Sequence, residues 1–373
     1  MTKKQVIRCI AFVLVVCAAL LVLCDLFEQE NGGNTDRCFN TYRALGKDTV
    51  DAVFIGTSGV ACYWVSPLAY EEFGMTVYPL ASDALPAWLY TNMIDEVLTY
   101  QNPELILLDI RPFTSGAVEQ EKMDANARFV LDAMDMFSLN RHKTAVKTMK
   151  TIHSVYEEAP EFDISYFLSF VKYHGKWTDA QYLVSYNLGQ RMHKYGGYRL
   201  DPDFSAVVRE MSPTEYDPSL VKDLNPLCEQ SLYEVLDYIR EKELDVLFVD
   251  TPKVLGSKVG VTNRVFQILE EEGFEYLTYL DIPEDGSFPL EIDFRTDFFN
   301  EGHVNYYGAE KYTHALAVYL KEHYDLPDRR NDPRVQADWD GLYAKIQEDL
   351  KVIEADTAAR GDSVAVGAMP AEE

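Results

Sequence analysis

A serine follows an apolar segment in "VDAVFIGTSG" (50–59), where Gly-Thr-Ser-Gly ends the run of β-branched and aromatic residues. A serine hydroxyl in such a turn can attack an acyl carbon when a neighbouring base takes its proton. The same residue types are common in ordinary tight turns, where Ser58 would only cap a helix. Ser58 is therefore a candidate nucleophile that needs a base from elsewhere in the chain.

His303 is the candidate base. It lies in "TDFFNEGHVNYYG" (296–308), directly before an amphipathic segment. A catalytic histidine needs a partner on its second ring nitrogen. Asn300 can reach that nitrogen within a tight loop, and Asp297 is the nearest preceding carboxylate. The alternative is a loop histidine that caps the following helix.

Both candidates must be positioned by the elements around them. The sequence predicts five buried strands that alternate with helices, which indicates an α/β protein with a parallel, doubly wound sheet. The predicted strands are 50–56, 75–81, 104–110, 244–252 and 274–281, and the helices include 86–100, 232–243, 261–273 and 308–324. Ligands of such sheets bind outside the carboxyl ends of the strands, which is where Ser58 stands.

The rest of the chain divides by composition. We expect a linker at 28–47, a domain at 48–330, a C-terminal helix at 331–355 and a disordered tail at 356–373. Within the domain, residues 115–230 are rich in aromatic residues and lack strong strand patterns. We interpret them as one mostly helical insertion between the third and fourth strands, covering the carboxyl ends of the sheet.

Residues 1–27 predict a transmembrane signal anchor. Lys3, Lys4 and Arg8 precede an uncharged run from Cys9 to Cys24. That run is near the lower limit for spanning a bilayer, and the positive charge before it favours a cytoplasmic N-terminus with the rest of the chain outside. A cleaved signal peptide and a buried helix are the alternatives.

The composition excludes some classes of function. The formal net charge of −27 over 373 residues argues against a nucleic-acid partner, because no basic surface is available to neutralise phosphates. Cys38, Cys62 and Cys228 lie outside the apolar segment and form no C-x-x-C motif, so we expect neither a disulfide framework nor a zinc site. No cofactor is expected.

Two blocks carry a family resemblance. "FIGTSGVACYWVSPLAYEEFGM" (54–75) and "TDFFNEGHVNYYGAEKYTHALAVYL" (296–320) resemble the nucleophile and histidine blocks of the SGNH/GDSL hydrolase superfamily. More narrowly, with "YFLSFVKYHGKWTD" (166–179), they are similar to membrane-anchored SGNH-like bacterial proteins of lipoteichoic-acid D-alanyl transfer and alginate O-acetylation. The resemblance implies a three-layer αβα, flavodoxin-like domain behind one transmembrane helix.

The resemblance also implies roles at the site. Ser58 matches the nucleophile and His303 the base, whereas Asn300 stands where many members have the triad aspartate. An asparagine can hold the ring in the right tautomer but cannot stabilise imidazolium by charge. Either Asp297 substitutes, or the site is slow, or a Ser-His dyad suffices. Gly59 stands where many relatives have histidine, and its flexible amide suits an oxyanion hole.

In the superfamily, further oxyanion donors come from the loops after the second and third strands, which here contain Ser82 and Arg111. The alternative for Arg111 is a salt bridge to Asp109 or Asp83. In the insertion, His174 and Trp177 are candidate substrate-binding residues of the cleft, with core packing as their alternative.

Lys253 follows the fourth strand in "DTPKV" and so stands at the carboxyl edge of the sheet. We expect it to be a solvated surface lysine.

Two functions fit these patterns. The first is an extracytoplasmic serine O-acyltransferase or esterase that acts on a cell-surface polysaccharide or teichoic-acid-type polymer. The resemblance implies a membrane-bound O-acyltransferase as its partner. The second is a non-catalytic glycan-binding or scaffold module in a complex that acylates a surface polymer.

Overall fold

Five short apolar segments form one parallel sheet in the computed structural model, which describes residues 1–27, 33–179 and 192–365. The strands are β1 (Ala52–Gly56), β2 (Val77–Ala81), β3 (Leu105–Asp109), β4 (Val246–Asp250) and β5 (Tyr276–Thr278). They lie in the order β2-β1-β3-β4-β5, and every pairing is parallel. The five predicted strands are therefore confirmed, each within the range expected from the sequence. The order reverses between β1 and β3, and the carboxyl ends of these two strands flank the place where such sheets bind ligands.

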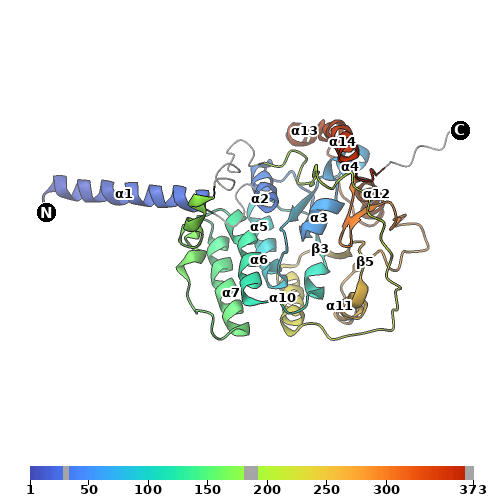
Figure 1. The fold of residues 1–373 in the computed structure, drawn as a ribbon, viewed down its shortest axis with the longest axis horizontal. Helices are drawn as coiled ribbons and strands as arrows, with labels where there is room; N and C mark the ends of the chain where they lie inside the picture. Colours follow the sequence, from blue (N-terminus) through green and yellow to red (C-terminus); the bar gives the residue numbers. More distant parts are fainter. Residues whose placement is uncertain (28–32, 180–191, 366–373) are drawn as a thin grey trace.

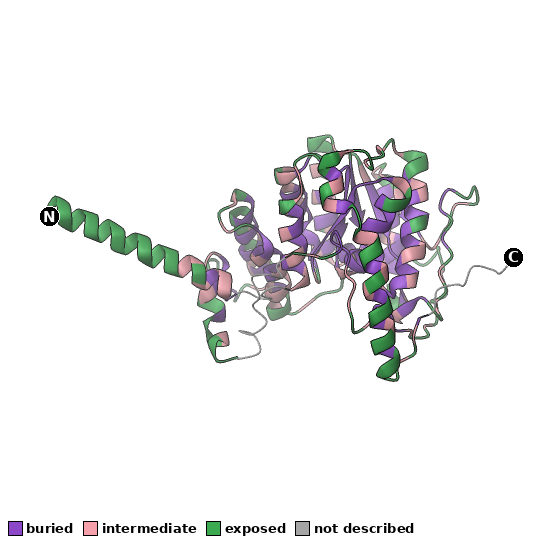
Figure 2. Cartoon of the chain, turned by 90° about the horizontal axis from the view of Figure 1, so that it is seen from above, coloured by how far each residue is buried: buried purple, intermediate pink, exposed green. Residues whose placement is uncertain are grey.

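Helices cover both faces of this sheet (Figures 1 and 2). On one face, Val53 and Ile55 of β1 belong to a core with residues of α2, α5, α10 and α11; on the other, Ala52 and Phe54 pack with residues of α3, α4, α12 and α14. This alternation follows from the period of two along a strand. The bounds are α2 (Asn34–Ala44), α3 (Ser58–Tyr63), α4 (Ser66–Phe73), α5 (Tyr90–Tyr100), α10 (Pro226–Lys242), α11 (Val259–Glu271), α12 (Tyr306–His323) and α14 (Leu342–Ala359). The chain is thus a mixed α/β protein.

The insertion between β3 and β4 is helical before residue 179, whereas its described residues 192–225 form turns and irregular backbone. The prediction of a mostly helical insertion therefore holds for its first part only. That part holds α6 (Gln120–Ala133), α7 (Leu139–Val155) and α8 (Ser169–Tyr173), with short 3-10 turns η3 (Ile164–Tyr166) and η4 (His174–Thr178). Further 3-10 turns elsewhere are η1 (Ala87–Leu89), η2 (Arg111–Thr114) and η6 (Gly256–Lys258). The part of the predicted insertion at 180–191 lies outside the described residues.

Two predicted boundaries are wrong. Most of the described part of the expected linker forms α2, because Cys38, Phe39 and Tyr42 recur at helical spacing and pack into the core beside β2. The expected helix at 331–355 is two helices, α13 (Pro333–Trp339) and α14, and α14 continues into the expected tail. Val364 then forms a bridge with Val207. Residues 366–373 lie outside the described range.

The N-terminal helix α1 (Lys3–Leu26) projects from the body of the protein (Figure 2). Its mean hydropathy over the most apolar stretch is 3.0, and that stretch is not buried against the rest of the protein. By length and composition, α1 is able to span a membrane. Only its end is packed: Ser169 of α8 donates to the Cys24 carbonyl, and Phe27 contacts Phe170.

A hairpin leads into the closing helix. Strands β6 (Phe298–Asn300) and β7 (His303–Val304) pair antiparallel, apart from the main sheet, and α12 begins two residues later. His303 therefore does not stand in an irregular loop but opposite Asn300 in the hairpin register.

Candidate active site

Ser58 is the first residue of α3, immediately after β1 and Thr57. Thr57 is the N-cap of α3, and its hydroxyl accepts the Gly59 N–H at 3.3 Å and donates to Asp109 of β3 at 3.2 Å. Gly56 permits this turn: a Cβ there would lie 2.4 Å from Val60 Cγ2 and 2.6 Å from the Asp109 Cβ. A residue with a side chain would therefore push the turn away from β3, and Ser58 with it.

The structure brings Ser58 and His303 into hydrogen-bond contact. Ser58 Oγ lies 2.9 Å from His303 Nε2, although 245 positions separate the two residues. This separation is within the reach needed for a base to take the serine proton. Both side chains are only partly buried, so the pair is open to a substrate.

Asn300 determines which ring nitrogen of His303 carries the proton. Its Oδ1 accepts the backbone N–H of Gly302 at 2.9 Å, so the atom on this side is the amide oxygen. The same Oδ1 lies 3.0 Å from His303 Nδ1. Nδ1 must therefore carry the proton and donate it, which leaves the Nε2 lone pair facing Ser58. The relay runs from Ser58 to His303 to Asn300.

The surroundings of His303 keep its ring neutral. Burial, followed by the positive charges of Arg111 and Arg199, lowers the pKa of His303 to about 3. Its ring stacks on Phe299 with centroids 5.5 Å apart. A neutral ring is available to accept a proton at neutral pH, but the same charges oppose the imidazolium that forms when it does. Within the described residues, His303 is therefore a neutral ring with no carboxylate beside it to balance an imidazolium charge.

Arg111 holds the His303 hairpin in place. Its Nη1 donates to the Gly302 carbonyl at 2.8 Å and its Nη2 to Thr251 Oγ1 at 2.8 Å. Arg111 forms no ion pair with Asp109 or Asp83 among the described residues, and Asp83 instead lies 3.5 Å from Arg199. Burial disfavours the charged guanidinium, but the nearby Asp109 carboxylate raises the pKa of Arg111 overall. Arg111 therefore stays cationic between β3, β4 and the hairpin.

The sequence did not indicate two residues, Thr251 and Tyr63, that help Arg111 to hold the hairpin; we call these contacts the Arg111 clamp. Thr251 directly follows β4 at the carboxyl edge, a signal that could have identified it. Tyr63, at the end of α3, donates to the Pro252 carbonyl and lies 3.3 Å from the Gly302 carbonyl. No sequence pattern marks Tyr63, because the loops it joins are brought together only by the fold.

The candidate oxyanion donors differ in availability. Ser82 is fully buried, and its N–H is used by the Gly56 carbonyl at 3.0 Å, so it is not a free donor. The Gly59 N–H makes only the long bond to Thr57. Arg111 Nε is buried without a partner in the described part of the chain, and a Gly59 Cβ would lie 3.0 Å from the guanidinium. Among the described residues, Gly59 and Arg111 therefore remain the candidate oxyanion donors beside Ser58.

Asp297 does not orient His303. Its carboxylate accepts from Lys311 Nζ at 2.8 Å, from the Asp293 N–H at 2.8 Å and from Thr296 Oγ1 at 3.0 Å. These bonds fasten the base of the hairpin to α12. The suggestion that Asp297 substitutes for a triad aspartate is wrong, because its oxygens are turned to these partners and Asn300 occupies Nδ1.

Three further residues were expected at or near the site from the sequence: His174, Trp177 and Lys253. His174 and Trp177 lie on η4, which follows the helix that packs against the end of α1, and both are exposed. Neither lines the cavity beside Ser58. Lys253 is not a solvated lysine but is 6% exposed, and its ammonium pairs with the buried Asp250 carboxylate. Burying this lysine is tolerable because the charge is paired.

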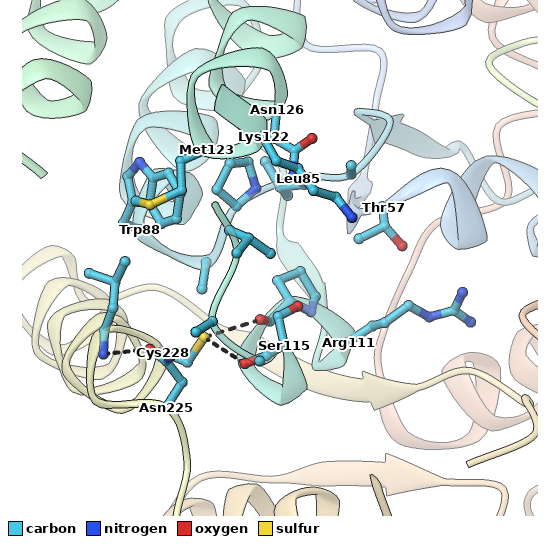
Figure 3. A pocket seen from close by; sticks show the side chains of 18 of the residues that line it. Thr57, Leu85, Trp88, Arg111, Ser115, Lys122, Met123, Asn126, Asn225 and Cys228 are labelled. Atoms are coloured by element: carbon cyan, nitrogen blue, oxygen red, sulfur yellow. Dashed lines mark hydrogen bonds between the residues drawn. The ribbon is translucent and has the colours of Figure 1, made fainter. Parts of the chain in front are cut away.

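A cavity of about 620 Å³ opens beside Ser58 (Figure 3). Thr57, Ser58 and Arg111 line it together with residues of η1, α6 and the start of α10. Its volume is in the range of small-molecule sites. The serine therefore stands beside a space that can hold part of a substrate.

A scan against protein-family models and a search of curated proteins found no match for this chain.

Proposed function

We propose that the protein is a serine-dependent acyltransferase or esterase of the SGNH-like kind. The observation that carries this proposal is the relay from Ser58 Oγ to His303 Nε2, at 2.9 Å, and from His303 Nδ1 to Asn300 Oδ1, at 3.0 Å. The strand order β2-β1-β3-β4-β5, with Ser58 and Arg111 on either side of the switch point, supports a flavodoxin-like assignment.

The chemistry follows from the positions of the groups. Ser58 Oγ attacks the acyl carbonyl while its proton passes to His303 Nε2, and the Gly59 N–H and Arg111 stabilise the oxyanion. The bond from the acyl carbon to the leaving oxygen then breaks, and His303 returns the proton to that oxygen. A second hydroxyl, or water, attacks the Ser58 ester by the same steps in reverse, which frees the serine.

The setting of the site supports a substrate outside the cell. We propose that α1 crosses the membrane with its N-terminus in the cytoplasm, because Lys3, Lys4 and Arg8 precede the apolar run. The acceptor would then be a hydroxyl of a bacterial cell-surface polysaccharide or teichoic-acid-type polymer. A membrane-bound O-acyltransferase would supply the activated acyl group from the membrane side.

The test replaces Ser58 in the producing bacterium and measures ester-linked acyl groups on its surface polymers. Ser58→Ala should abolish this acylation while the full chain accumulates normally in the membrane. Ser154→Ala, an exposed serine on α7 whose hydroxyl donates to Thr151, is the matched control and should leave acylation unchanged. Unchanged acyl content in Ser58→Ala would contradict the proposal.

One observation favours the second candidate function, a non-catalytic glycan-binding or scaffold module. His303 has no carboxylate partner in the described part of the chain, and burial with the charges of Arg111 and Arg199 lowers its pKa to about 3, so proton transfer from Ser58 is uphill. A module of this kind would retain surface-polymer acylation in Ser58→Ala and lose it on deletion of the whole chain.

A further inference from the structure

The cavity beside Ser58 is mostly apolar away from the serine. Leu85, Pro86 and Trp88 line it from the segment after β2, Met123 from α6 and Leu227 from α10. Trp88 and Met123 lie next to one another at the end farthest from Thr57 and Arg111 (Figure 3). A wall of this composition stabilises an apolar chain by removing it from water.

The charges around the cavity all have one sign. Arg111, Lys122 and Lys258 line it, and no Asp or Glu does so among the described residues. This is notable in a chain with 61 acidic and 34 basic residues. The Lys122 side chain extends from α6 toward Thr57, so positive charge gathers at the end of the cavity that holds the serine (Figure 3).

Two of these cations have no protein counter-charge. Within the described ranges, neither Lys122 nor Lys258 forms a salt bridge. Burial, together with the positive charges of Lys253 and Arg111, lowers the pKa of Lys258. The Arg111 Nε has no partner in the described chain but is itself buried, so an anion in the cavity would lie beside the guanidinium and not on this atom. An anion bound beside Arg111 and Lys122 would supply a counter-charge at this end of the cavity.

We propose that this cavity binds an amphipathic anion, with an apolar acyl chain along Leu85, Trp88 and Met123 and a phosphate or carboxylate beside Arg111 and Lys122. This inference deepens the proposed function and rests on it for the reacting position of the ligand: the acyl donor would be an ester whose chain is longer than acetyl and whose anionic group lies close to the carbonyl. Binding itself does not depend on the Ser58 hydroxyl.

The test measures binding to the full chain in phosphatidylcholine nanodiscs, in the Ser58→Ala background, by calorimetry. Four probes distinguish the contribution of the ligand's alkyl group from that of its charge. They are decyl phosphate, butyl phosphate, inorganic phosphate and decyltrimethylammonium, all below micelle-forming concentrations. Decyl phosphate should bind at least tenfold more tightly than decyltrimethylammonium. From butyl to decyl, affinity should rise by two- to fourfold per methylene until the cavity is filled.

Two pairs of variants place the probe. Lys122→Gln should weaken decyl phosphate binding about three- to tenfold, whereas Lys150→Gln, an exposed lysine of α7 outside the cavity, should not. Val155→Glu puts a carboxylate on the cavity wall and should abolish binding, whereas Val146→Glu on the same helix should not. Both valines are at least 40% exposed, so neither change should unfold the protein.

The outcomes separate this inference from the proposed function. Decyl phosphate binding in Ser58→Ala, with no serine reactivity in the unmodified chain, would support the binding site and contradict the enzyme. Serine reactivity without charge-selective binding, or binding that Val155→Glu leaves intact, would overturn the inference and leave the enzyme standing.

Discussion

Giving His303 a carboxylate partner is the change that the geometry makes most informative. In Asn300→Asp, both acceptor contacts of Asn300 Oδ1, to the Gly302 N–H and to His303 Nδ1, are retained by a carboxylate oxygen. The only new feature is a negative charge about 3 Å from the ring nitrogen that carries the proton. This charge opposes the effect of Arg111 and Arg199, which lower the pKa of His303 to about 3.

The size of the effect follows from the distance and the exposure. Two unit charges about 4 Å apart interact by about 1 kcal/mol in water and about 4 kcal/mol at a protein surface. Asn300 is exposed, so solvent screening places the expected gain at about 1–2 kcal/mol. If the imidazolium is nearly fully formed in the transition state, Ser58 should react about fivefold to thirtyfold faster, and the pKa of His303 should rise by about one unit.

Two measurements check this prediction. The second-order rate of Ser58 labelling by a fluorophosphonate reports the reactivity of the serine, and NMR titration of labelled histidine reports the pKa of His303 without any assay of activity. Asn102→Asp, at an exposed position between α5 and β3, is a control for an added surface charge. A raised pKa with an unchanged or slower labelling rate would refute the assignment of His303 as the base.

Four further predictions concern the same site and its support. Arg111→Lys should slow Ser58 labelling at least tenfold while cooperative urea unfolding is retained, because a lysine ammonium lacks the planar two-pronged geometry with which Arg111 binds the Gly302 carbonyl and Thr251 together. An unchanged rate would mean that the Arg111 guanidinium does not position the hairpin. Labelling between pH 5 and 8 should show no inflection from His303, because its pKa of about 3 leaves the ring neutral throughout, whereas an inflection near 6.5 would contradict the burial argument. Because this pKa lies below that of an unfolded histidine, His303 should lower the free energy of unfolding as pH falls from about 6.5 toward 3. In His303→Gln, the free energy of unfolding measured by urea titration should therefore fall less steeply with pH over that window. Asp297→Ala should lower the free energy of unfolding by about 2–3 kcal/mol, because the hydrogen bonds from Lys311 and from the Asp293 N–H are lost. A change below about 0.5 kcal/mol, as expected for a neutral surface substitution, would contradict the role of Asp297 in stabilising the hairpin.

The sheet was predictable because its strands are continuous apolar runs. Leu105–Asp109 and Ala52–Gly56 are buried throughout, and segments of this kind have few alternatives to a central parallel strand. The pairing of Ser58 with His303 was predictable as well, because one follows β1 and the other precedes the closing helix. Their contact needed only that both segments meet at one edge of the sheet.

Other features depend on contacts that no local pattern encodes. The glycines before α2 predict a flexible linker, but the stability of this helix comes from packing Phe39 and Tyr42 beside β2. Lys253 is buried only because Asp250 is buried beside it. The clamp of Arg111 on Gly302 joins residues 191 positions apart, and its partner is a backbone carbonyl, which any residue provides. Sequence alone therefore predicts the candidate pair but not the structure that holds it.

We propose that His303 activates Ser58. This activation can be measured by labelling the full chain in nanodiscs with a fluorophosphonate probe and mapping the modified residue by peptide mass. We expect one modified site, Ser58, with labelling lost in Ser58→Ala and reduced at least a hundredfold in His303→Ala, on the order of the contribution of a general base. Absence of label on Ser58 in the folded protein, or equal labelling in His303→Ala, would contradict this activation.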